Sequence, residues 1–152
     1  MINVVIDTSG SMNSLGKPQV ITSIMRELQL TDGISFNYFC WGENVKEISD
    51  SDGFSDINFE GKSSIKSLLE FLRKNDGNYL LLTDGFSNEE KSDFTAFIRD
   101  NSDIRFRVVL VGADSRIING KSFFPETFIV TEQEKYVFNS LEVFCAIESF
   151  NF

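Results

Sequence analysis

The chain has 152 residues, of which 41% are hydrophobic and 24% charged, and its formal net charge is -9. This length and apolar content predict one domain, residues 1–152, with a core of its own. The acidic balance and the absence of a lysine and arginine cluster exclude the electrostatic footprint of a nucleic-acid-binding protein.

The sequence also bears on where the protein works. No basic segment followed by an apolar stretch comes after Met1, and every apolar run is far shorter than the ~20 residues that a membrane helix needs. We therefore expect a cytoplasmic protein without membrane contact. Cys40 and Cys145 have apolar neighbours, so we expect both to be buried and reduced.

The first half of the chain alternates between strand and helix patterns. Residues 2–6 predict a strand, and a helix is expected from near Pro18, a favourable residue in a first turn. The apolar side of that helix consists of Val20, Ile21, Ile24, Met25 and Leu28. Residues 34–40 and 45–48 predict a hairpin toward an edge of the sheet, because Gly42-Glu43-Asn44 separates them.

The second half continues the alternation. A helix is expected around the apolar stripe Ile65, Leu68, Leu69 and Leu72, and a third helix should open with a capping box of Ser87 and Glu90 and bury Phe94, Phe97 and Ile98. Strands are predicted over 79–83, 106–111 and 127–130, and a last helix over 132–148. Strands that alternate with helices predict an α/β sandwich with a mostly parallel sheet and right-handed crossovers.

Oxygen-bearing side chains follow the first strand directly. The segment Asp7-Thr8-Ser9-Gly10-Ser11-Met12 carries a carboxylate and two hydroxyls at alternate positions. Such oxygens suit Mg²⁺, Mn²⁺ or Ca²⁺, whereas zinc and copper sites favour imidazole or thiolate, and the chain contains no histidine. One carboxylate with two neutral hydroxyls leaves a divalent ion strongly electrophilic toward an anionic ligand.

Two further loops are expected to join this one. Asp84 follows the strand at 79–83 as Asp7 follows the first strand. Ligands of open α/β sheets bind beyond the carboxyl ends of the strands, so both aspartates face one crevice if their strands are neighbours. Gly61-Lys62-Ser63-Ser64, just before the second helix, adds hydroxyls and a helix N-terminus that favours an incoming anion.

With these three loops, the chain resembles a von Willebrand factor A (vWA) domain with a metal-ion-dependent adhesion site (MIDAS). The family pattern is D-x-S-x-S after the first strand, a threonine in a Gly-rich loop before a middle helix, and an aspartate after the fourth strand. The matching residues are Asp7, Ser9, Ser11, Ser63 and Asp84. Ser63 departs from the usual threonine, and Ser64 is an alternative source of that hydroxyl.

The resemblance covers essentially the whole chain and implies both a fold and a way of binding. The fold would be a Rossmann-like three-layer α/β sandwich, with a mostly parallel six-stranded sheet, one antiparallel edge strand and helices on both faces. Ser9, Ser11 and the third-loop hydroxyl would coordinate Mg²⁺, or Mn²⁺ or Ca²⁺ in its place, while Asp7 and Asp84 act largely through bound water. A glutamate or aspartate of a protein partner would fill the last position.

Other motifs carry less weight. Gly61-Lys62-Ser63 resembles the end of a phosphate-binding P-loop, but Asp56 stands where that motif needs its first glycine. The acidic stretch of Glu89, Glu90 and Asp93 is typical of a solvated face and receives no role in the site. The loop 114–116 is compatible with ligand contact or with a plain turn, and the aromatic pair in 123–125 with docking a partner or with packing under a helix.

The favoured function is therefore a non-enzymatic, Mg²⁺-dependent protein-binding module, similar to intracellular vWA-like adaptors. The alternative is a metal-dependent hydrolase of phosphate esters, since the same ion could polarise a phosphoryl oxygen. That alternative lacks a histidine as general base, and Lys62 is the one cationic residue within the three loops. A scaffold that keeps the fold without a metal is a third reading, against which the complete set of candidate ligands argues.

Overall fold

The computed structural model describes residues 1–14, 16–49, 54–75, 77–111 and 127–130. In chain order its elements are β1 (Ile2–Asp7), the 3-10 helix η1 (Gly10–Asn13), α1 (Lys17–Gln29), β2 (Phe36–Trp41), β3 (Val45–Ile48), the 3-10 helix η3 (Phe54–Asp56), α2 (Ile65–Lys74), β4 (Asn78–Thr83), α3 (Asn88–Asp100), β5 (Arg105–Val111) and β6 (Thr127–Val130). The three helices predicted before residue 101 are present. The helix predicted over 132–148 and the loops 114–116 and 123–125 lie outside the described residues.

The strands form a mixed sheet in the order β3-β2-β1-β4-β5-β6. Neighbouring strands run parallel except β2 and β3, which pair antiparallel as the predicted hairpin requires. Strand β1 pairs with β2 on one side and β4 on the other. The chain thus builds outward from β1 to β3 and then returns to the far side of β1, so the strand order reverses between β1 and β4. The predicted α/β class and mixed sheet are confirmed.

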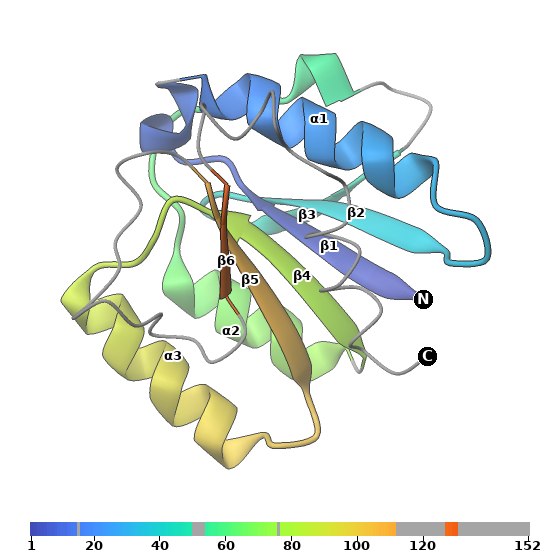
Figure 1. Ribbon diagram of the computed structural model, residues 1–152. Helices are drawn as coiled ribbons and strands as arrows, with labels where there is room; N and C mark the ends of the chain where they lie inside the picture. The colour runs from blue at the N-terminus through green and yellow to red at the C-terminus, as the bar shows by residue number, and fades with distance from the viewer. Residues whose placement is uncertain (15, 50–53, 76, 112–126, 131–152) are drawn as a thin grey trace.

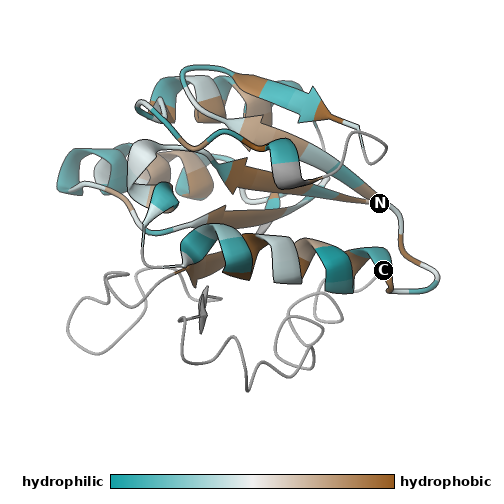
Figure 2. Cartoon of the chain, turned by 90° about the horizontal axis from the view of Figure 1, so that it is seen from above, coloured by the Kyte–Doolittle hydropathy of each residue, from teal (hydrophilic) through white to brown (hydrophobic). Residues whose placement is uncertain are grey.

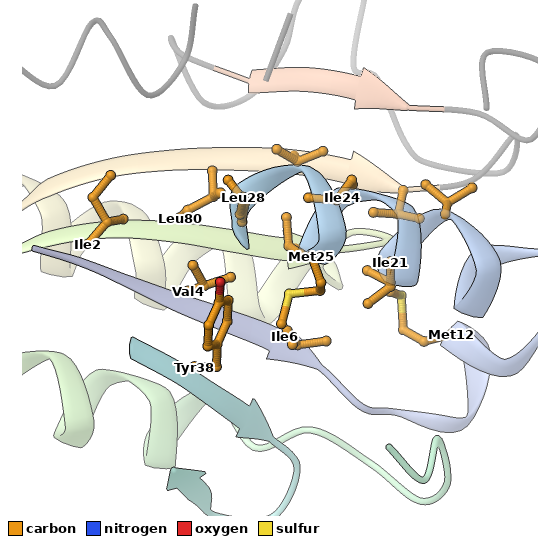
Figure 3. Packing of buried hydrophobic residues seen from close by; sticks show 14 of the residues in the cluster. Ile2, Val4, Ile6, Met12, Ile21, Ile24, Met25, Leu28, Tyr38 and Leu80 are labelled. Atoms are coloured by element: carbon orange, nitrogen blue, oxygen red, sulfur yellow. The ribbon is translucent and has the colours of Figure 1, made fainter. Parts of the chain in front are cut away.

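Helix α1 lies against one face of the sheet (Figure 1). Its apolar stripe is buried as the sequence predicts, and Figure 3 shows Ile21, Ile24, Met25 and Leu28 directed toward side chains of β1 and its neighbours. Those partners include Ile2, Val4, Ile6, Tyr38 and Leu80. Full burial of one such side chain stabilises the fold by about 1.5–3 kcal/mol, so this face fixes the start of α1 beside the end of β1.

Helices α2 and α3 lie on the opposite face, where aromatic rings join them to the sheet (Figure 1). The ring of Phe86 lies between Trp41 and Phe94, with centroid distances of 5.9 Å and 5.3 Å. Figure 2 shows the apolar strands between helices that carry hydrophilic positions. Trp41 ends β2 and is 2% exposed, so this packing holds the end of β2 firmly beside the end of β1.

The helix starts also follow the sequence. Ser87 and Glu90 form the predicted capping box of α3, and Ser64 caps α2 by accepting a hydrogen bond from the backbone N–H of Ser67. Phe94 and Phe97 are buried as predicted, and Ile98 is partly buried. These caps fix the loops that precede α2 and α3.

The structure tests in part what the sequence predicts about the cysteines and about membrane helices. Cys40 is free but only partly buried, and burial raises the pKa of its thiol. Cys145 lies outside the described residues. None of the helices that the structure describes is both long and apolar enough to pass through a membrane.

Candidate metal site

The residues predicted to form the metal site surround one pocket of about 340 Å³ at the carboxyl ends of β1 and β4. Its lining includes Asp7, Ser9, Ser11, Ser63 and Asp84. Asp7 is the last residue of β1, and Asp84 directly follows β4. Because β1 and β4 are parallel neighbours, the two aspartates share the crevice that their positions in the sequence predict.

Asp7 is the most constrained side chain of the site, with an exposed fraction of 3%. Its Oδ1 accepts hydrogen bonds from the backbone N–H of Ser9 at 2.9 Å and the hydroxyl of Ser63 at 2.6 Å, and its Oδ2 accepts one from the Thr83 hydroxyl at 2.7 Å. Burial raises the pKa of Asp7, and these hydrogen bonds oppose the rise. A cation beside this carboxylate would offset its loss of hydration.

The hydroxyls of Ser9 and Ser11 lie side by side because η1 turns the chain directly after β1. Their Oγ atoms are 3.1 Å apart. An octahedral Mg²⁺ holds oxygen ligands at about 2.1 Å, which places adjacent ligands about 3.0 Å from each other. Ser9 is the N-cap residue of η1, yet its side chain caps no backbone N–H. The pair therefore has a spacing suited to a small divalent ion.

Ser63 supplies the third hydroxyl beside Asp7. In addition to its contact with Asp7, its Oγ lies 2.9 Å from the carbonyl oxygen of Trp41, to which it can also donate. The Ser64 hydroxyl instead accepts a hydrogen bond from Ser67 at the start of α2. Of the two alternatives left by the sequence, the geometry favours Ser63.

Backbone hydrogen bonds join the loop that follows β1 to the loop that precedes α2. The N–H of Gly10 donates to the carbonyl oxygen of Gly61, and the N–H of Glu60 donates to that of Thr8, each at 3.0 Å. Gly61 has a φ of 77°, in the left-handed region that favours glycine. The candidate ligands from these loops are thus positioned by the backbone as well as by their own hydrogen bonds.

Lys17 is a residue of the site that the sequence analysis missed. Its side chain is 0% exposed, and its Nζ donates hydrogen bonds to Asp84 Oδ2 and to the carbonyl oxygen of Ser11, both at 3.1 Å. A signal was present, because Lys17 precedes Ile21 by four residues and so falls on the apolar stripe of α1. A charge on a buried stripe indicates a nearby partner of opposite charge.

Thr83 and Glu90 also lie at the site, and the sequence did not predict this. Thr83 is 0% exposed and orients Asp7 through its hydroxyl. Its position in the sequence of β4 does not distinguish this role from that of an ordinary core residue. Glu90 lines the pocket, although its Oε2 accepts the hydrogen bond of the capping box from the N–H of Ser87. Lining the pocket does not give Glu90 a part in metal binding, so its lack of a role in the site stays a prediction.

The donor set fits a hard divalent cation. Across the described parts of the chain, no three acidic, cysteine or histidine side chains gather at one point, so an ion here would depend on hydroxyl oxygens. The residues able to hold it are Ser9, Ser11 and Ser63, with the Asp7 carboxylate behind them. Oxygen donors without nitrogen or sulfur suit Mg²⁺ and Mn²⁺ rather than zinc or copper.

Comparisons with known proteins identify the fold. No family model matches the sequence, and no curated protein does. Among solved structures, a von Willebrand factor type A protein from Catenulispora acidiphila matches 98% of this chain and 42% of its own, with a TM-score of 0.65 and 13% identity. BatB from Bacteroides thetaiotaomicron matches 97% of this chain and 98% of its own, with a TM-score of 0.63 and 11% identity. The pilus adhesin SpaC from Lactobacillus rhamnosus GG matches 98% of this chain and 30% of its own, with a TM-score of 0.59 and 11% identity.

These likenesses show that the chain has the α/β fold of vWA domains. The chain spans less than half of the Catenulispora protein. At identities this low, a shared fold assigns neither a ligand nor a partner. The function must therefore be argued from the candidate metal site itself.

Proposed function

We propose that this protein is a divalent-cation-dependent binding module that holds Mg²⁺ in the candidate metal site and ligates a carboxylate of a partner protein through it. One observation carries the proposal: the Ser63 hydroxyl bonded to the buried Asp7 carboxylate and the paired hydroxyls of Ser9 and Ser11 line the same open pocket. The vWA fold supports it, because it suggests an interaction module.

The hydrogen bonds within the site give each side chain a role. A hydroxyl that donates its proton to Asp7 keeps its oxygen lone pairs for another partner, and Ser63 is in this arrangement. Thr83 fixes the other oxygen of Asp7 so that the carboxylate cannot rotate. When bound, Mg²⁺ would supply an electrophilic position for an external carboxylate.

An anionic partner needs a local attraction at this pocket, because the protein as a whole is acidic, with a formal charge of -9. Lys62 is exposed and lines the pocket, so it offers one positive charge near the entrance. A single exposed lysine is screened by salt and contributes little by itself. The proposal therefore assigns the main attraction to the bound cation.

The wider predictions from the sequence remain part of the proposal. It treats residues 1–152 as one Rossmann-like domain of three layers with a six-stranded sheet. It assigns the protein no catalytic activity, and the hydrolase alternative is disfavoured because the chain has no histidine to act as a general base. Cytoplasmic localisation stays a prediction, since solved structures of the same fold include a pilus adhesin.

Mn²⁺ as a paramagnetic probe and acetate as a minimal carboxylate test the proposal. We expect EDTA-stripped protein to bind Mn²⁺ at one saturable site, and acetate to lower the water relaxation enhancement relative to chloride at equal ionic strength. Ser9→Ala should lose this site. Ser23→Ala is the matched control, because its hydroxyl bonds to the carbonyl oxygen of Gln19 on α1.

Two results would contradict the proposal. One is the absence of saturable Mn²⁺ binding to the wild-type protein both with and without acetate. The other is a bound Mn²⁺ whose water relaxation is the same in acetate and in chloride, because no carboxylate would then replace water on the ion.

A further inference from the structure

The buried ammonium of Lys17 carries an inference that rests on the proposed function. We propose that Lys17 is a built-in cation that makes the candidate metal site dependent on the partner's carboxylate. By neutralising Asp84, Lys17 lowers the affinity of the chain alone for the divalent ion. The bound ion then keeps a positive charge that an external carboxylate neutralises. Lys17 is thus a specificity-determining residue for an anionic partner.

The placement of Lys17 supports a permanent role. Its side chain is 0% exposed, and its Nζ lies 3.1 Å from Asp84 Oδ2. The residue belongs to the first turn of α1, whose apolar stripe is packed against the sheet. The ammonium cannot move into solvent without disturbing that turn. It therefore stays beside the pocket whether or not an ion is bound.

The charges of the site explain why this matters. Asp7 and Asp84 bring two negative charges to the pocket, and Lys17 cancels one of them; Glu90 and Lys62 also line the pocket, and their opposite charges cancel each other. A divalent cation would then leave the site with one net positive charge, which a single carboxylate neutralises. Without Lys17, the two aspartates would neutralise the ion by themselves, and an external carboxylate would gain much less.

The same ammonium also touches the loop that carries the candidate ligands. Its second hydrogen bond goes to the carbonyl oxygen of Ser11, at 3.1 Å. Lys17 therefore joins the Asp84 loop to the Ser11 loop. Lys17→Met distinguishes a structural role from an electrostatic one. If Lys17 only holds the two loops together, the variant should bind the metal more weakly; if its positive charge repels the metal, the variant should bind the metal more tightly.

The test compares Mn²⁺ affinities of EDTA-stripped wild type, Lys17→Met and Lys66→Met, each with and without acetate at equal ionic strength. Methionine keeps the length and apolar character of the buried chain. We expect Lys17→Met to bind Mn²⁺ about tenfold more tightly, because a nearby positive charge no longer repels the ion, and to gain less affinity from acetate. Lys66 is exposed on α2, so Lys66→Met removes one charge from the protein and should behave like the wild type.

A second pair of variants keeps the inference falsifiable if Lys17→Met does not fold. Asp84→Asn leaves the Lys17 charge uncompensated, so we expect weaker Mn²⁺ binding and a larger gain from acetate. The double variant Lys17→Met/Asp84→Asn has the wild-type charge at the site, and its affinity should return toward the wild-type value. An acetate gain that is the same in Asp84→Asn as in the wild type would overturn the inference.

The outcomes separate this inference from the proposed function. If the wild type binds one Mn²⁺ but Lys17→Met binds it no more tightly, the metal site stands and the role of Lys17 is wrong. If neither protein binds Mn²⁺ at a saturable site, both proposals fail. If Lys17→Met binds Mn²⁺ tightly and the wild type binds it only in acetate, both are supported.

Discussion

Removal of the Thr83 hydroxyl probes how the buried carboxylate of Asp7 is held. Thr83→Val keeps the branched shape of the side chain, so it should create neither a cavity nor a clash. The variant removes the 2.7 Å hydrogen bond to Asp7 Oδ2 and the acceptor for the Gly85 N–H at 3.2 Å. Both effects occur at a residue that is 0% exposed, where water does not replace the missing partner.

The magnitude follows from these two contacts. A hydrogen bond to a charged group contributes about 1.5–3 kcal/mol, and a neutral one about 1 kcal/mol. The buried methyl group of valine offsets part of this loss, about 1 kcal/mol. We therefore expect Thr83→Val to lower the free energy of unfolding by about 1.5–3 kcal/mol at neutral pH, in EDTA. Its Mn²⁺ affinity should fall as well, because Asp7 would no longer be fixed on both oxygens.

Urea unfolding of the stripped protein measures this change, with Thr22→Val as the control. The Thr22 hydroxyl donates at 2.9 Å to the carbonyl oxygen of Pro18 within α1, so its loss concerns a neutral acceptor that is partly exposed. We expect the control to change stability by less than about 1 kcal/mol. If Thr83→Val costs no more than Thr22→Val, the hydrogen bond from Thr83 does not hold Asp7 in place.

Burial raises the pKa of Asp7, so the folded protein binds the proton of the Asp7 carboxyl more tightly than the unfolded chain does. This proton binding stabilises the folded state fully below the ordinary pKa of 3.8, and the stabilisation is lost as the pH rises through the raised pKa. Urea unfolding in EDTA should thus show wild-type stability declining relative to Asp7→Asn from acid to neutral pH, and parallel curves would contradict this. Ser64→Ala should cost about 1 kcal/mol through loss of the α2 cap and leave Mn²⁺ affinity unchanged in calorimetry. Ser63→Ala should weaken Mn²⁺ binding, and equal Mn²⁺ affinities of the two serine variants would refute the choice of Ser63.

Local patterns predicted much of the described fold, because each pattern has one dominant physical cause. The apolar stripe of α1 and the capping box at Ser87 fixed the helix positions, and Gly42-Glu43-Asn44 marked the antiparallel hairpin. Element ends shifted slightly: β2 begins at Phe36 where the sequence predicts residue 34. Strand ends depend on pairing with neighbours, which the alternation of side chains in one strand does not encode.

The candidate site was predicted only in part. The positions of Asp7 and Asp84 after apolar strands placed them at one pocket, since parallel strands end at the same edge. The apolar stripe of α1 marks Lys17 as unusual, but the partners of Lys17 and Thr83 are 67 and 76 residues away in the chain, at distances where no sequence period identifies them. The choice between Ser63 and Ser64 likewise needed coordinates, because adjacent hydroxyls differ only in direction.

Calorimetric titration of Mg²⁺ and Mn²⁺ into EDTA-stripped wild type and Asp7→Ala tests the central claim most directly. Moderate salt suppresses diffuse binding of cations to the acidic surface. The account predicts one saturable site in the wild type in the presence of acetate, and loss of that site in Asp7→Ala, whose fold should persist in far-UV circular dichroism. Equal binding by the two proteins, or no saturable site in the wild type with acetate present, would contradict it.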